Sequence, residues 1–267
     1  MEKFRLFNFV IHGIDNRENI LFLHGFMGAG EDWHVIIDGL KNNFNCITID
    51  LPGHGQNLPE KITNYTFEGC TDNIMSLIND MGIDECHIAG YSMGGRIGLH
   101  LLADFPERFG KIILESVNPG IESGKAREQR IENDRITAER IVTGDLVDFL
   151  TGWYSQPFFG RLNEHVNFPD LMNKRLKNDR EGLSNSLNYM STGKQKPFWN
   201  RIPEIENRIL YIAGSLDDKY VTIGKKLSEL NRNIKFAITE NAGHNTHFQE
   251  PEIYIEKVKE FLLEQED

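Results

Sequence analysis

The stretch Cys86–His100 reads Cys-His-Ile-Ala-Gly-Tyr-Ser-Met-Gly-Gly-Arg-Ile-Gly-Leu-His, and the rest of the chain is interpreted from it. A short apolar run leads into Gly90-Tyr91-Ser92-Met93-Gly94, and a helical pattern follows. The two flanking glycines allow the close backbone contacts of a sharp turn that holds the serine hydroxyl exposed, as a nucleophile requires. A plain tight connection or a phosphate-binding loop would also be rich in glycine, so the surrounding sequence has to distinguish these alternatives.

The composition is that of an ordinary globular protein, with 267 residues of which 39% are hydrophobic and 26% charged. A net charge of −11 argues against non-specific nucleic-acid binding, because a phosphate backbone would be repelled. Residues 120–200 hold 12 basic and 11 acidic side chains, which leaves 17 basic and 29 acidic ones elsewhere. The near-neutral middle segment is therefore where arginines that bind an anionic small molecule are expected.

The cysteines and the N-terminus indicate the compartment. Cys46, Cys70 and Cys86 are odd in number and lack the spacing of a metal site, which favours buried free thiols in a reducing environment. The N-terminus lacks the basic and apolar regions of a signal peptide, and no apolar run has the length of a membrane span. We therefore expect a soluble, cytoplasmic protein with no membrane partner.

Short, continuously apolar runs alternate with amphipathic helical patterns over the first 115 residues and again after residue 207. Continuous apolarity indicates strands buried on both faces, as in a parallel sheet between helices. The expected strands are 4–10, 20–23, 46–49, 86–89, 111–114, 208–213 and 234–239, and the expected helices are 67–81, 93–104, 222–230 and 251–263.

The alternation stops between residues 119 and 196, where 127–142 and 168–190 have helical patterns and no strand-like run is present. The prediction is one α/β core domain made of residues 1–118 and 197–267, with a helical cap inserted at residues 119–196.

Three of the residues that follow strands form a catalytic set. Ligands of an open parallel sheet bind beyond the carboxyl ends of its strands. A serine hydroxyl needs a histidine to take its proton, and that histidine needs a buried carboxylate. Ser92, Asp217 and His244 occur in the chain order serine, acid, histidine, with Asp218 and His247 as alternatives for the last two. The residues that follow the expected strands are His24-Gly25-Phe26, Asp50, Ser92, Glu115-Ser116, Asp217 and His244.

Backbone amides are the expected anion stabilisers, one from Met93 directly after the serine and one from Phe26 in the early loop. No metal site is expected, because the nine histidines include no His-x-x-x-His pair. No cofactor is expected either, since the Ser92 motif lacks the Lys-Ser/Thr of a phosphate-binding loop and the spacing of a dinucleotide fingerprint.

Several motifs together have a more specific meaning. They are Leu-His-Gly-Phe-Met-Gly at 23–28, Asp-Leu-Pro-Gly-His-Gly at 50–55, Gly-Tyr-Ser-Met-Gly-Gly-Arg at 90–96, Trp-Tyr-Ser-Gln-Pro-Phe at 153–158 and Ala-Gly-His-Asn at 242–245. With Pro119-Gly120 and the arginine-rich stretch after it, they resemble the 2-succinyl-6-hydroxy-2,4-cyclohexadiene-1-carboxylate synthase family of menaquinone biosynthesis, in the α/β-hydrolase superfamily. The resemblance implies an α/β-hydrolase fold with a mostly parallel sheet and a helical cap.

The same resemblance implies a cofactor-independent lyase. Its serine acts as a base, and pyruvate is eliminated from 2-succinyl-5-enolpyruvyl-6-hydroxy-3-cyclohexene-1-carboxylate. Arginines hold the substrate carboxylates, which suits their planar, bidentate guanidinium. His24 is included among the substrate-binding residues, although stabilisation of its own loop is the favoured role, and Arg127 is the alternative to Arg130. The implied substrate-binding residues are Arg96, Arg130, Arg175, Tyr91, Trp153, His24, Lys219 and Tyr220.

Two other functions share parts of this pattern. An esterase or a carbon–carbon bond hydrolase of the same fold would use the same triad without the arginines. A non-catalytic binding module would keep the fold, but the intact triad argues against it. The expected partner is a small polycarboxylate molecule, and the expected state is a monomer or a weak homo-oligomer.

Overall fold

A seven-stranded sheet forms the centre of the computed structural model, which describes residues 7–13 and 17–264. The strand order is β1-β3-β2-β4-β5-β6-β7, with β1 antiparallel to β3 and the other pairs parallel. The first expected strand begins in residues 1–6, outside the described part, and the observed strand starts at Phe9. The strands are β1 Phe9–His12, β2 Asn19–Leu23, β3 Asn45–Ile49, β4 Cys86–Tyr91, β5 Phe109–Glu115, β6 Ile209–Gly214 and β7 Ile234–Thr239.

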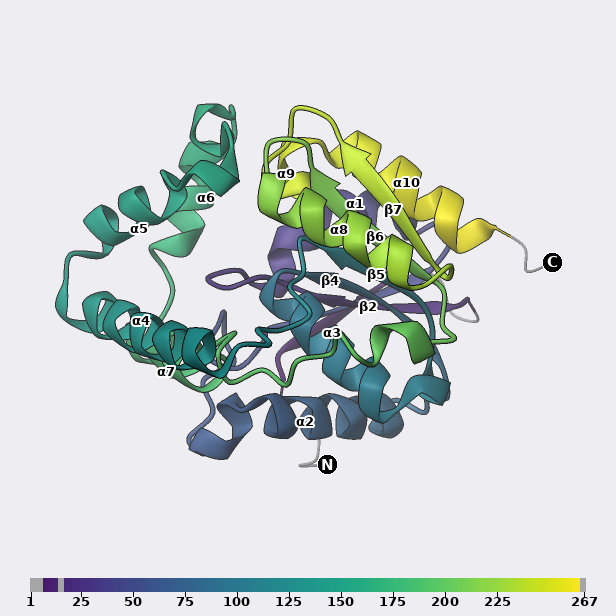
Figure 1. The fold of residues 1–267 in the computed structure, drawn as a ribbon, viewed down its shortest axis with the longest axis horizontal. Coiled ribbons are helices and arrows are strands. Elements are labelled where there is room, and N and C mark those ends of the chain that lie inside the picture. The colour runs from purple at the N-terminus through teal and green to yellow at the C-terminus, as the bar shows by residue number, and fades with distance from the viewer. Residues whose placement is uncertain (1–6, 14–16, 265–267) are drawn as a thin grey trace.

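Helices cover both faces of this sheet, which explains the continuous apolar runs (Figure 1). Leu21 and Leu23 pack in the cluster that holds α2 Phe67–Asp80, α3 Met93–Asp104 and α8 Asp218–Leu230. Ile20 and Phe22 point the other way, toward α1 His34–Leu40 and α10 Pro251–Leu263. Alternate residues of one strand therefore serve two separate hydrophobic clusters.

Four helices follow β5 and precede β6, and Figure 1 shows them as a group beside the sheet. They are α4 Gly124–Thr143, α5 Leu146–Tyr154, α6 Phe168–Arg175 and α7 Arg180–Tyr189. Their apolar side chains form a third cluster that includes Leu150, Phe159 and Leu187. The expected single helix over 168–190 is wrong, because Asp179 caps a new helix by accepting a hydrogen bond from the Gly182 amide. Helix α5 was not predicted.

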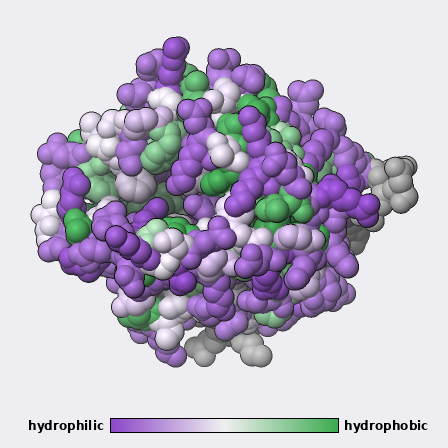
Figure 2. Space-filling model, viewed as in Figure 1, coloured by the Kyte–Doolittle hydropathy of each residue, from purple (hydrophilic) through white to green (hydrophobic). Residues whose placement is uncertain are grey.

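The three cysteines are buried and free, as predicted. Burial raises the pKa of the Cys46 and Cys86 thiols to about 12, which makes them unreactive near neutral pH. The face seen in Figure 2 is mostly hydrophilic, with small and separate apolar areas. Within residues 7–13 and 17–264, no helix has the length and apolarity to cross a membrane.

Candidate active site

Ser92 lies at the turn between β4 and α3 with φ 49° and ψ −104°, a conformation that costs a non-glycine residue about 1–3 kcal/mol. Its amide donates to the Glu115 carbonyl at 2.9 Å, so the neighbouring strand stabilises the turn. A Cβ on Gly94 would lie 2.1 Å from the Leu23 carbonyl oxygen. The glycine is thus required for the serine turn to pack against β2.

Ser92, His244 and Asp217 form a hydrogen-bonded chain. His244 Nε2 is 3.1 Å from Ser92 Oγ, and His244 Nδ1 is 2.7 Å from Asp217 Oδ2. A carboxylate only accepts, so Nδ1 carries the proton and Nε2 is left to accept the serine proton. Asp217 is 1% exposed, whereas the alternative acid Asp218 is an exposed first residue of α8. The alternative histidine, His247, is bonded to Glu115.

The amides of Phe26 and Met93 are available to an anion. Both residues line the cavity that contains Ser92. Neither amide donates a hydrogen bond to an acceptor within the described residues, whereas the next amide, of Gly94, donates to the His24 carbonyl at 3.0 Å. The pair therefore has the free donors that an oxyanion site requires.

The cavity at the serine has a volume of about 330 Å³ and lies between the sheet and the inserted helices. The core contributes the triad side of its wall, and α4, α5 and α7 contribute the opposite side. Of the expected substrate-binding residues, six line it: Tyr91, Arg96, Arg130, Trp153, Lys219 and Tyr220.

Arg96 is a buried cation that lacks an anionic partner. It is 9% exposed, and no carboxylate in the described part of the chain lies within ion-pair distance of it. Nη1 donates to the Met190 carbonyl at 2.8 Å, and the guanidinium lies 5.6 Å from the Phe67 ring centroid. Burial, followed by the charge of Arg130, lowers the pKa of Arg96 to about 10, so it remains charged at neutral pH.

Arg130 belongs to α4 and lines the same cavity as Arg96, and its charge is partly neutralised by Asp134. Its Nε donates to both carboxylate oxygens of Asp134, at 2.9 and 2.8 Å. Asp134 also accepts from Ser191 Oγ at 2.6 Å. The alternative residue, Arg127, donates from Nε to the Gly193 carbonyl at 3.2 Å and does not line the cavity. Of Arg130 and Arg127, Arg130 is therefore the one that lines the cavity containing Ser92.

Lys219 and Tyr220 border the triad from the start of α8. The Tyr220 ring lies 4.6 Å from the His244 ring, centroid to centroid, and burial followed by Asp217 raises the pKa of Tyr220 to about 12. Lys219 is exposed, and partial loss of its hydration, followed by the charge of Arg130, lowers the pKa of its amine. Both residues line the same cavity as Arg96 and Arg130.

The other two expected substrate-binding residues line a smaller adjoining cavity, which shares Phe26, Tyr91 and Trp153 with the first. Arg175 is 5% exposed and forms an ion pair with Asp32, and it does not line the cavity with Ser92. His24 donates from Nδ1 to the Gly25 carbonyl at 2.7 Å and accepts at Nε2 from the Leu51 amide at 2.9 Å. Both ring nitrogens of His24 thus hold loop backbone, and Arg175 is paired with Asp32, which favours a structural role for each. The substrate contacts expected for these two residues stay predictions.

Ser116 is a cavity residue to which the sequence assigned no role. It has φ 52°, it is fully buried, and its Oγ has no hydrogen-bond partner among the described residues. A left-handed φ is unfavourable for a serine, and the neighbouring strand holds this turn, since the Ser116 amide donates to the Ile212 carbonyl at 2.9 Å. Its position directly after a strand was the only available signal.

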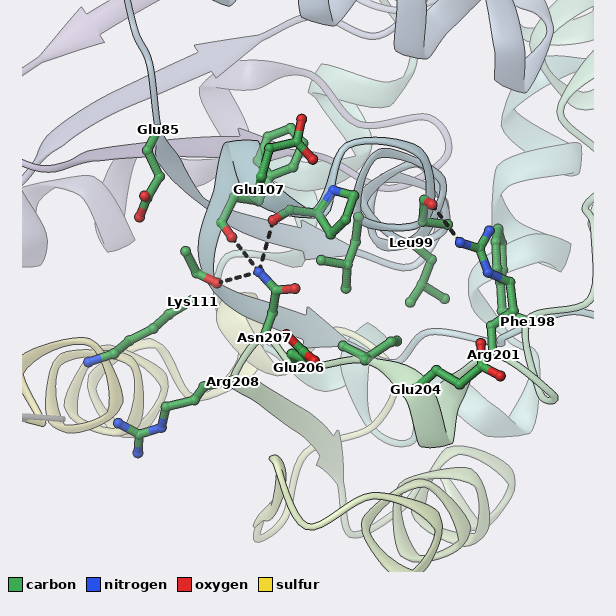
Figure 3. Close-up of a pocket in the computed structure, with 16 residues that line it drawn as sticks. Glu85, Leu99, Glu107, Lys111, Phe198, Arg201, Glu204, Glu206, Asn207 and Arg208 are labelled. Atoms are coloured by element: carbon green, nitrogen blue, oxygen red, sulfur yellow. Dashed lines mark hydrogen bonds between the residues drawn. The ribbon is translucent and has the colours of Figure 1, made fainter. Parts of the chain in front are cut away.

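A larger cavity of about 600 Å³ lies at the opposite edge of the sheet, near the starts of β5 and β6 (Figure 3). No histidine, serine or cysteine lines it. Asn207 donates from Nδ2 to the carbonyls of Pro106, Phe109 and Gly110, and Arg201 donates to the Ala103 carbonyl. These polar groups are occupied in stabilising loops, so the chemistry belongs to the smaller cavity.

The fold and the site define a class of protein. Residues 18–251 match the family model described as alpha/beta hydrolase fold, and this segment is most of the chain. The chain therefore belongs to the alpha/beta hydrolase fold family, and the predicted fold class is confirmed.

Its relatives narrow this class. The chain is 31% identical over 254 residues to a Bacillus subtilis (strain 168) protein provisionally named 2-succinyl-6-hydroxy-2,4-cyclohexadiene-1-carboxylate synthase, a match that covers 94% of this chain and 92% of that one. It is 28% identical to the synthase of that name from Serratia proteamaculans (strain 568), and the match covers 94% of this chain and 95% of that one. The structure of MenH from S. aureus superposes with a TM-score of 0.90 at 26% identity, and the match covers 97% of this chain and 98% of that one. Within the fold family, the chain belongs with these synthases.

Proposed function

We propose that this protein is a lyase of menaquinone biosynthesis. It eliminates pyruvate from 2-succinyl-5-enolpyruvyl-6-hydroxy-3-cyclohexene-1-carboxylate and leaves 2-succinyl-6-hydroxy-2,4-cyclohexadiene-1-carboxylate. The proposal rests on the relatives of that name and on the chemistry of the cavity. A small polycarboxylate is the substrate class, and the cytoplasm is the proposed compartment.

The observation that carries the proposal is the unpaired charge of Arg96 beside Ser92. A buried guanidinium without a counter-ion is unfavourable, because it has lost water and gained no opposite charge. Arg96 belongs to the first turn of α3, and its side chain lines the same cavity as the serine. A substrate carboxylate would supply the missing charge and hold the reacting carbon near Ser92. An uncharged ester would leave Arg96 unpaired.

The triad then acts on a C–H bond. His244 Nε2 accepts the proton of Ser92 Oγ, while Asp217 stabilises the resulting imidazolium. Ser92 removes a ring proton, and the electrons of that C–H bond form a new ring double bond. The existing ring double bond moves by one position and expels the enolpyruvyl oxygen, so the ring C–O bond breaks. The departing oxygen takes the proton held by His244, which returns the histidine to its neutral form, and the released enol becomes pyruvate. The amides of Phe26 and Met93 stabilise the negative charge that develops in the transition state.

Residues 119–196 serve as the cap of this site. They supply Arg130, Trp153 and the Met190 carbonyl to the cavity wall or to Arg96. A cap that excludes water strengthens charge pairing with the substrate and prevents hydrolysis at the activated serine.

Pyruvate release tests the proposal. Purified protein should release pyruvate from the enolpyruvyl substrate, and Ser92→Ala should abolish the release. Hydrolysis of nitrophenyl esters is measured in parallel, since an esterase would use the same triad. Rapid ester cleavage without pyruvate release would overturn the lyase assignment in favour of a hydrolase.

A further inference from the structure

We propose that Glu115 is a positioning residue that sets the place of the catalytic His244 loop relative to Ser92. It acts through Thr246, His247 and its own backbone, and it does not line the cavity. The inference concerns assembly of the triad, so it holds for an elimination and for a hydrolysis alike.

The Glu115 carboxylate is fully buried at the carboxyl end of β5, and both of its oxygens are used by one short segment. Oε1 accepts from the Thr246 amide at 2.6 Å, from Thr246 Oγ1 at 2.8 Å and from the His247 amide at 3.1 Å. Oε2 accepts from His247 Nδ1 at 2.6 Å. Hydrogen bonds to a charged acceptor in a dry environment are the strong ones, so four of them fix this segment firmly.

These partners come two and three residues after the catalytic histidine, and they begin the short helix α9 Thr246–Gln249. A shift of Thr246 would therefore move His244 directly through the backbone. The side of the loop before His244 has weaker supports: the His244 amide donates to the Phe158 carbonyl at 2.9 Å, and Gly243 donates to Gln249 Oε1. One of these comes from residues 119–196, whereas Glu115 is a carboxylate that the core supplies to the residues directly after His244.

The main chain of Glu115 contacts the serine turn. Its carbonyl accepts the Ser92 amide at 2.9 Å, and Glu115 pairs with Tyr91 in the register of β5 and β4. One residue thus contacts the serine turn with its main chain and the histidine loop with its side chain. Glu115 thus connects the two sides of the 3.1 Å separation between Ser92 Oγ and His244 Nε2.

The ring of His247 also packs against the residue that precedes Ser92. Its ring is stacked on Trp33 at 4.2 Å and meets Tyr91 edge-on at 4.9 Å, centroid to centroid. Tyr91 directly precedes the serine, so the His247 ring fills the space between the two catalytic loops. His247 is the histidine that the sequence offered as an alternative to His244, and its role here, paired with Glu115, is to hold His244 and Asp217 in place.

The test compares Glu115→Gln, Glu115→Ala and Thr246→Val by the rate at which a fluorophosphonate labels Ser92. Labelling needs only the triad, so its result does not depend on the proposed substrate. Displacement of a catalytic group by about 1 Å can cost roughly 10²-fold, and we expect a loss of that order for Glu115→Ala. Glu115→Gln should lose less than the alanine variant, because its amide oxygen still accepts from Thr246 and His247. Where pyruvate release is measured, kcat should fall and KM should stay within about 2-fold, since the arginines are untouched.

Lys111→Met is the matched control. Lys111 is buried in the same strand at its opposite end, where it donates to the Leu262 and Glu264 carbonyls. It should lower the melting temperature without slowing labelling below that temperature. Wild-type labelling rates in folded Glu115→Gln or Glu115→Ala would overturn the inference, as would a loss no greater than in Lys111→Met. If both Glu115 variants fail to fold, Thr246→Val decides: a several-fold loss supports the link, and an unchanged rate overturns it.

Discussion

Arg175 Nη2 lies 2.7 Å from Asp32 Oδ2, and this buried ion pair joins α6 to the short helix after β2. The two side chains are 6% and 11% exposed, and Arg175 Nε is also 3.1 Å from Tyr154 Oη. Burial opposes the charge on Arg175, but Asp32 and Tyr154 outweigh it and raise the pKa of the guanidinium. Arg175 thus has its counter-ion within the protein, whereas Arg96 has none.

Arg175→Met should destabilise the fold by about 3–5 kcal/mol, because it leaves Asp32 buried without its partner. Urea unfolding at pH 7 measures the loss. Asp32→Leu combined with Arg175→Met should recover much of it, since no buried charge then remains unpaired. KM of the folded Arg175→Met variant should be unchanged. A raised KM with unchanged stability would instead place Arg175 on the substrate.

Arg96→Met should have the opposite effect on stability. Removal of an unpaired buried cation relieves its desolvation cost, so the free energy of unfolding should rise by about 1 kcal/mol. Catalytic efficiency should fall by at least about 30-fold, or ~2 kcal/mol of transition-state stabilisation, if Arg96 binds a substrate carboxylate. Thermal unfolding and steady-state kinetics on one sample check both outcomes. Unchanged kcat/KM would remove Arg96 from the site.

Arg130→Met and Arg127→Met form a matched pair on α4. Only Arg130 lines the cavity, so its loss should raise KM by about 10-fold, equivalent to ~1.4 kcal/mol of binding. Arg127 donates to the Gly193 carbonyl, and its loss should leave KM within about 2-fold. Equal effects of the two substitutions on KM would argue that neither arginine contacts the substrate.

His100 should make stability depend on pH. It is 2% exposed, stacked on Phe67 at 4.4 Å, and its Nε2 has no partner among the described residues. Burial lowers the pKa of His100 to about 4 from an ordinary value near 6.5. Between these values the unfolded chain binds the extra proton, so the stability present above pH 6.5 is lost as pH falls toward 4. The loss reaches about 3 kcal/mol.

Urea midpoints at pH 7.5 and 5 check this dependence. His100→Phe keeps a flat ring between Phe67 and Phe198 and should flatten the dependence. Burial also lowers the pKa of His24, His54 and His87, so part of the acid sensitivity should remain in the variant. A midpoint that falls equally in both proteins would show that His100 is not the titrating group.

The triad could be predicted from the sequence because each member directly follows a strand. Parallel strands place their carboxyl ends at one edge, so Ser92, Asp217 and His244 were expected together although 152 residues separate the serine from the histidine. The same reasoning placed Phe26 and Met93 beside the serine, and both residues line its cavity. That their amides bind an anion stays a prediction.

The inserted helices were harder to predict. Helix α5 has nine residues that are mostly apolar and aromatic, too few to show a helical period clearly. The break before α7 depends on the Asp179 cap. In both places local signals are short, and packing of the third hydrophobic cluster decides the outcome.

The sequence by itself determined the succession of core strands along the chain, the serine turn and the three residues of the triad, because these follow from the local pattern and strand direction. Only the tertiary structure decided which arginine is paired and which is free. Arg175 meets Asp32 across 143 residues of chain, and Arg96 meets no carboxylate in the described residues. Pairing of charges depends on which helix faces which loop, and side-chain type does not carry that information.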